Sequence, residues 1–75
     1  MNKIIERQVG NNIRMLRENA GLTQEMLTTK LQLLGCDITR SAVAKIEVGQ
    51  RHIYPDELIL IKKILNVEFD ELLKI

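Results

Sequence analysis

Capping residues and glycines divide the chain into short segments, and each segment has the apolar spacing of an amphipathic helix. Gly21, Gly35 and Gly49 fall where helical patterns end, a place that favours glycine because it adopts left-handed backbone angles. Thr23 and Thr39 stand where two patterns begin, and a threonine side chain can accept a hydrogen bond from a free amide of the first helical turn. The end signals agree with the periodicity between them, which predicts an all-α fold.

The first predicted helix covers residues 3–19. Apolar side chains recur there at intervals of four, four and three, as one face of a helix requires, at Ile5, Val9, Ile13 and Leu16. Gly10 lies inside this pattern, where it costs about 1 kcal/mol relative to alanine. We expect it either to permit close packing against another helix or to lie in a frayed first turn.

Two further helices are predicted over residues 23–34 and 39–47, joined by a tight connection that contains Gly35. The side chains expected to point into the core are Met26, Leu27, Leu31, Leu34, Ile38, Val43 and Ile46. The second helix of the pair keeps Arg40, Ser41 and Lys45 on its exposed face. Two helices connected in this way form a helix-turn-helix, and the exposed face of the second is the candidate for contacting DNA.

Two more helices complete the prediction. Pro55 begins the fourth, where its missing amide proton costs nothing, and Asn66 suits a left-handed stop before a short last helix over residues 69–73. On the fourth helix, Leu60 and Ile64 form a second apolar row beside the one made by Leu58, Ile61 and Leu65. This surplus predicts a subunit interface, unless the first helix covers it.

Size and composition exclude several classes of protein. Seventy-five residues, 45% apolar and 28% charged, predict one small globular domain over residues 1–75. No apolar run approaches the length of a membrane span and no secretion signal is recognisable, so the expected location is the cytoplasm. Cys36 and His52 are single residues of their kinds, too few for a zinc site, and they lack the neighbours of a nucleophile and its base. We therefore expect neither a metal, a cofactor nor enzymatic activity.

Positive charge is concentrated in the first three helices. Residues 1–54 contain eight Lys or Arg against five Asp or Glu, whereas residues 55–75 contain three against five, within a net charge of only +1. Local patches govern attraction to phosphates, because salt screens charges over about 10 Å. The basic excess thus accompanies the candidate DNA-contacting unit.

Four segments carry a family resemblance: residues 13–17 (IRMLR), 21–25 (GLTQE), 41–49 (SAVAKIEVG), and 66–67 (NV) followed by 70–73 (DELL). In this order they resemble the phage repressor and Cro type of helix-turn-helix domain, also called the xenobiotic response element family of transcriptional regulators. The resemblance runs from about Val9 to Leu73. It implies a five-helix, repressor-like fold whose members mostly bind operator DNA as dimers, with the third helix in the major groove.

The resemblance also implies roles for individual residues. Gln24 falls where family members contact a phosphate or a base, and Arg51 falls in a loop that often touches the DNA backbone. Arg17 and Glu47 match an ion pair that joins the first helix to the third. The third-helix positions that meet base edges are Arg40, Ser41, Ala42 and Lys45. For Thr39 we expect a capping role first and a phosphate contact second.

The chain departs from the family pattern in two places. Between Leu31 and Arg40 it has about five residues more than the commonest family spacing, which predicts a longer second helix or a wider turn. Glu68 stands where the family commonly has a serine or threonine cap, so we expect the last helix to fray.

Together these features predict a sequence-specific transcriptional regulator, a repressor that binds double-stranded DNA as a homodimer without a small-molecule ligand. Arg40 is the best candidate for direct readout because its guanidinium can donate two hydrogen bonds to guanine, worth about 1–3 kcal/mol of discrimination. The alternative is a protein-interaction module on the same fold, such as an antitoxin or an anti-repressor, which would bind another protein through Leu60 and Ile64.

Overall fold

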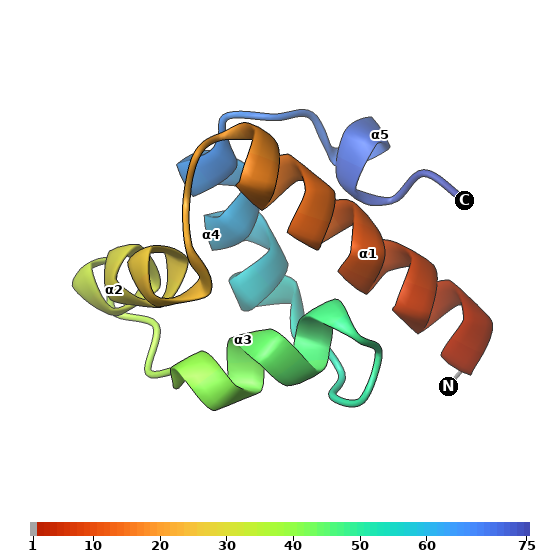
Figure 1. The fold of residues 1–75 in the computed structure, drawn as a ribbon, viewed down its shortest axis with the longest axis horizontal. Helices are drawn as coiled ribbons and strands as arrows, with labels where there is room; N and C mark the ends of the chain where they lie inside the picture. Colours follow the sequence, from red (N-terminus) through yellow and green to blue (C-terminus); the bar gives the residue numbers. More distant parts are fainter. Residues whose placement is uncertain (1) are drawn as a thin grey trace.

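The chain folds into short helices whose ends agree with the capping pattern. The computed structural model describes residues 2–75, which contain five helices and no strand (Figure 1). The helices are α1 (Lys3–Asn19), α2 (Gln24–Leu33), α3 (Arg40–Glu47), α4 (Pro55–Leu65) and α5 (Phe69–Leu72). The prediction of an all-α, repressor-like fold is confirmed. None of these helices is long and apolar enough to cross a membrane.

Side chains and backbone angles account for where the helices begin and end. The Oγ1 atoms of Thr23 and Thr39 accept hydrogen bonds from the amides of Met26 and Ala42, each at 3.1 Å. Such caps satisfy amides that have no partner within the helix. Asn66, with a φ of 55°, ends α4 in the left-handed region, and so do the glycines that follow the first three helices, Gly21, Gly35 and Gly49.

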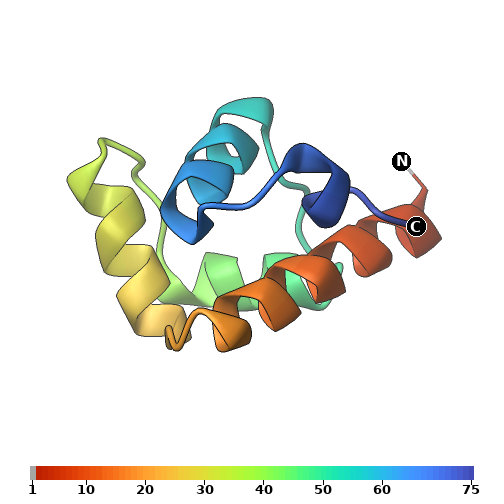
Figure 2. The ribbon, with the colours of Figure 1, turned by 90° about the horizontal axis from the view of Figure 1, so that it is seen from above.

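A single apolar core lies among the helices. Figure 2 shows α4 and α5 on one side of the molecule, with α1 and α3 on the other. The core consists of Val9, Ile13, Leu27, Leu31, Ile38, Val43, Ile46, Ile61, Leu65 and Leu72. Two inward expectations are wrong, because Met26 and Leu34 are 45% and 51% exposed. Helix α2 buries a narrow stripe of Leu27, Thr28 and Leu31. Successive residues of a helix point about 100° apart, so the neighbouring positions turn away from the core.

Helix α1 crosses the C-terminal end of α3 at very short range. A Cβ atom on Gly10 would lie 2.2 Å from the carbonyl oxygen of Ile46 and 3.0 Å from the carbonyl carbon of Glu47. A Cβ atom on Gly49 would lie 2.9 Å from the Cα atom of Arg7. Of the two explanations for Gly10, close packing is therefore the correct one. The N-terminal half of α1 lies against the end of α3 and the loop that follows it.

The connection between α2 and α3 is a wide turn, residues 34–39, rather than an extension of α2. Backbone hydrogen bonds tie the turn to the end of α2, where the amide of Cys36 donates to the carbonyl oxygen of Leu31 at 3.0 Å. The side chain of Gln32 donates to the carbonyl oxygen of Ile38 at 2.9 Å, and Ile38 itself is buried. The extra residues of the turn are thus held to α2 and to the core.

Residues 72–74 are attached to α1 through one side chain. The Nδ2 atom of Asn12 donates to the carbonyl oxygens of Leu72, at 2.9 Å, and Lys74, at 2.7 Å. Helix α5 lacks a serine or threonine cap, as the sequence indicates. The carboxylate of Glu71 instead accepts a hydrogen bond from the amide of Glu68 at 2.9 Å. The last helix is therefore held at both ends.

Candidate nucleic-acid interface

The exposed face of α3 carries two cationic side chains that are not paired with a carboxylate in the described part of the chain. Arg40, Ser41 and Lys45 are exposed, whereas Val43 and Ile46 lie in the core on the opposite face. Within residues 2–75, neither Arg40 nor Lys45 takes part in a salt bridge. A base contact was predicted for Ala42 too, and this residue is half-buried against the core.

A buried ion pair joins α1 to the C-terminal end of α3. The Nε atom of Arg17 lies 2.7 Å from Oε2 of Glu47, and the Nη2 atom donates to Oε1 at 3.1 Å. The Nη1 atom donates to the carbonyl oxygen of Leu22 at 2.7 Å, so the guanidinium also holds the start of the turn before α2. The hydrogen bond to Glu47 raises the pKa of Arg17, and burial, which acts in the opposite direction, does not cancel this effect. The side chain of Arg17 therefore stays charged.

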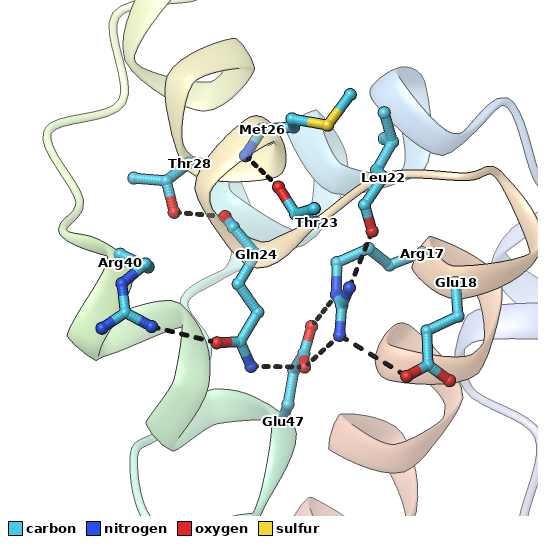
Figure 3. Close-up of polar contacts among 9 residues, drawn as sticks. All are labelled: Arg17, Glu18, Leu22, Thr23, Gln24, Met26, Thr28, Arg40 and Glu47. Carbon is cyan, nitrogen blue, oxygen red and sulfur yellow. Dashed lines mark hydrogen bonds and ion pairs between the residues drawn. The ribbon is translucent and has the colours of Figure 1, made fainter.

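Gln24 connects this ion pair to the exposed face of α3 (Figure 3). Its Nε2 atom donates to Oε1 of Glu47 at 3.0 Å, and its Oε1 atom lies 3.5 Å from Nη1 of Arg40. Because the amide nitrogen faces a carboxylate, the amide oxygen must face away from it, toward the arginine. A chain of polar contacts therefore runs from the core to the guanidinium of Arg40. Gln24 was predicted to contact DNA, whereas its contact with Glu47, a residue 23 positions away, was not predicted.

Arg51 already has an internal partner. Its Nη1 and Nη2 atoms donate to the two carboxylate oxygens of Glu57 at 2.9 and 3.0 Å, and its guanidinium lies 5.3 Å from the ring centre of Tyr54. Burial raises the pKa of Glu57, but the hydrogen bonds from Arg51 and from the Tyr54 amide outweigh it, so the net pKa lies below its ordinary value. Arg51 therefore holds the start of α4. A DNA contact from this arginine stays a prediction.

Sequence reasoning missed Glu57 as the partner of Arg51. One signal was present. Glu57 is only six residues after Arg51, and it lies in the first turn of a helix that begins at Pro55. A carboxylate there is favoured by the helix dipole and comes within reach of a preceding loop arginine. The contact between His52 and Glu6 has no such signal, because it joins the loop to α1 across 46 positions.

The apolar row of α4 is less exposed than its sequence suggests. Leu60 and Ile64 are half-buried and pack against the core, whereas Ile59 is 52% exposed. A subunit interface through Leu60 and Ile64 stays a prediction.

Cys36 is half-buried in the wide turn. Burial raises the pKa of its thiol, and the nearby carboxylates of Glu57 and Asp56 add to this effect. Over residues 2–75 no three side chains of the metal-binding types come together.

Comparison with known protein families agrees with this geometry. A family model described as helix-turn-helix matches residues 13–72, from the middle of α1 to the end of α5. Comparison with curated proteins and with solved structures gave no significant match. The matched range includes α2, the wide turn and α3, together with the ion pair of Arg17 and Glu47. The chain therefore belongs to the Cro/C1-type helix-turn-helix family of DNA-binding domains.

Proposed function

We propose that this chain is a transcriptional repressor that binds a two-fold symmetric operator as a homodimer, with α3 in the major groove. The observation that carries the proposal is the exposed face of α3, where the cations of Arg40 and Lys45 lie free of carboxylates while the opposite face is fixed in the core. An α-helix with its side chains is about 10–12 Å across, so α3 fits a major groove that is about 12 Å wide.

Arg40 is the residue to which we assign base recognition. Its guanidinium is exposed at the start of α3 and its side chain is directed by Gln24, which is itself held by Glu47. A bidentate contact to the O6 and N7 atoms of guanine is worth about 1–3 kcal/mol of discrimination. Ser41 and Lys45 are assigned to phosphates, and the methyl group of Ala42 to a thymine methyl.

Two helix N-termini lie beside this face. Gln24 is the first residue of α2, and Thr39 caps α3. The free amides at a helix N-terminus attract phosphate, so both ends can fix the register of the domain on the duplex. These contacts would position α3 and would carry no sequence information themselves.

Dimerisation is proposed because one module of 75 residues contacts few phosphates. Two copies double the contacts and place two α3 helices about one turn of DNA apart. We assign the interface to the face of α4 that includes Leu60 and Ile64. An occupied operator would then exclude or displace polymerase, without chemistry by the protein.

The test is selection of bound duplexes from a random pool, repeated at two salt concentrations, with Arg40→Ala beside the wild-type protein. A matched control is Lys30→Ala, which removes one exposed cation from α2. We expect a two-fold symmetric site with half-sites about one turn apart, and a relaxed sequence preference only in Arg40→Ala. No enrichment at low salt from a folded sample would overturn the proposal.

Sedimentation equilibrium tests the dimer separately. We expect a mass of twice 8.6 kDa in the free protein or on a duplex that carries both half-sites. A single copy on such a duplex would contradict the dimer. Tight binding of another protein that survives both Arg40→Ala and Lys45→Ala, without DNA binding, would favour the interaction-module alternative.

A further inference from the structure

A second basic surface lies beside α3, on α1. Two adjoining surface grooves lie between residues 3–14 of α1 and the C-terminal end of α3 with the loop after it. Val48 and Gln50 line both grooves, and so does Arg7. Lys3 lines the first groove, and Arg14 the second. The contacts proposed above include none of these three cations.

Three cations and two carboxylates line the grooves, and one of the carboxylates is already paired with an arginine. In the part of the chain that the structure describes, Lys3, Arg7 and Arg14 are exposed and form no salt bridge. The two carboxylates that line the grooves have partners, since Glu6 contacts the imidazole of His52 and Glu47 is paired with Arg17. The three free cations outnumber the carboxylate of Glu6, so the surface carries an excess of positive charge.

The packing of two glycines fixes this surface next to α3. Gly10 lets α1 approach the last residues of α3, and Gly49 lets the following loop approach Arg7, distances that a side chain at either position would prevent. The stripe of Lys3, Arg7 and Arg14 therefore lies alongside the end of the proposed recognition helix as part of one rigid packing unit. Val48 comes one helical turn after Lys45 and lines both grooves together with Arg7. A ligand that contacts Lys45 and Val48 can therefore extend to Arg7.

We propose that the grooves between α1 and α3 bind the phosphate backbone of the same DNA duplex that α3 enters, through Arg7 and Arg14 with Lys3 at the edge. This inference rests on the proposed DNA-binding function and extends its footprint beyond the helix-turn-helix. Free guanidinium groups at an electropositive groove favour phosphate oxygens, and the side chains of Asn11 and Gln50 add neutral donors beside them.

The dimensions suit a DNA backbone. Lys3 and Arg14 are 11 residues apart in one helix, which corresponds to about 16 Å at 1.5 Å per residue. One strand of B-DNA carries a phosphate for about every 3.4 Å of duplex axis. A strand that runs along α1 therefore offers several phosphates to the three cations. Contacts of this kind strengthen binding to every sequence equally, because phosphates carry no base identity.

The test compares the salt dependence of DNA affinity between Arg7→Gln/Arg14→Gln and the wild-type protein. The matched control is Lys30→Gln/Lys63→Gln, which removes the same charge from exposed positions on α2 and α4 that line neither groove. Each lost phosphate contact lowers the slope of log affinity against log salt by about 0.9. We expect the slope to fall by about 1.8 for each protomer in the α1 variant, and the preference between specific and random duplexes to remain unchanged.

Two further proteins make the result decisive. Arg7→Lys/Arg14→Lys keeps the charges, so we expect it to retain most of the wild-type slope, and thermal unfolding should show all variants folded. An unchanged slope in the Gln variant, or an equal fall in the control, would overturn the inference and leave the proposed function intact. Loss of sequence preference in Arg40→Ala, measured in parallel, reports on the proposed function alone. If the wild-type protein binds no duplex at all, both proposals fail.

Discussion

The guanidinium of Arg17 and the carboxylate of Glu47 form a two-pronged ion pair, with side chains only 8% and 1% exposed. Replacing one member leaves the other charge buried without its counter-charge, which costs about 3–5 kcal/mol. Arg17→Met should therefore lower the free energy of unfolding by several kcal/mol, measured by urea titration with circular dichroism.

The double variant Arg17→Met/Glu47→Leu removes both charges together. It should be more stable than Arg17→Met, because an apolar pair can replace a buried ion pair with little loss. An Arg17→Met protein as stable as the wild type would show that the pair has no structural role.

Gly10→Ala should destabilise the fold although alanine favours helices. Alanine at an unobstructed helical position stabilises by about 1 kcal/mol relative to glycine. At Gly10 the new methyl group would meet the carbonyl oxygen of Ile46 at 2.2 Å, so α1 and α3 must separate, at a cost of about 1–3 kcal/mol or more. A stabilised Gly10→Ala protein in thermal unfolding would contradict the close approach. Gly35→Ala is the comparison for backbone strain alone, since its φ is 88° and nothing lies within 4 Å of the new carbon.

Stability should depend on pH through Glu57. Hydrogen bonds from Arg51 and the Tyr54 amide leave its pKa, despite burial, below the ordinary 4.5, so the unfolded chain binds the proton more readily than the folded one. The contribution of Glu57 is therefore complete above pH 4.5 and is lost as the pH falls through the lowered pKa. Unfolding free energies between pH 7 and pH 3 should decline more for the wild type than for Glu57→Gln. Parallel profiles for the two proteins would contradict this assignment.

Gln24→Ala should weaken specific binding more than random binding. The substitution leaves Arg40 in place but removes the amide that lies between it and Glu47. Arg40 then has more rotamers to lose on contact with guanine, so the ratio of specific to random affinity should fall, by less than in Arg40→Ala. A double-mutant cycle for these two residues, measured by fluorescence anisotropy, should give a coupling energy of about 0.5 kcal/mol or more. If the effects of the two substitutions on affinity are strictly additive, Gln24 contacts a phosphate only and does not act through Arg40.

Cys36 should react slowly with thiol reagents at neutral pH. Burial and the neighbouring carboxylates raise the pKa of its thiol, and only the thiolate is nucleophilic. Its rate with an aromatic disulfide should be below that of a free cysteine peptide and should recover in urea. Faster reaction in the folded protein would indicate an activated thiol.

Local signals predicted the helices well. Thr23, Thr39 and Pro55 begin helices where the sequence places them, because caps act through bonds a few residues long. Periodicity alone did not distinguish the exposed side chains of Met26 and Leu34 from the buried side chains of Leu27 and Leu31. Which part of an apolar arc is buried depends on the helices that pack against it.

The features of the candidate site that the sequence did not predict are mainly contacts between distant segments. The exposed positions of Arg40, Ser41 and Lys45 follow from helical geometry, since Val43 and Ile46 must face the core. The contact of Gln24 with Glu47 depends on how α2 crosses α3, and the grooves beside Arg7 depend on how α1 crosses α3. Neither crossing is encoded in spacing along one helix.

The hydrogen bonds from Asn12 to residues 72 and 74 impose an order on biosynthesis. Asn12 is synthesised some sixty residues before its two acceptor carbonyls, so its side chain lacks these partners until residues 72–74 have been made. Closing this contact also spans nearly the whole sequence, which makes it a slow, late event compared with the formation of the helices. A nascent chain stalled before Leu72 would therefore lack both acceptors, and the polar side of α1 that carries Asn12 would face water.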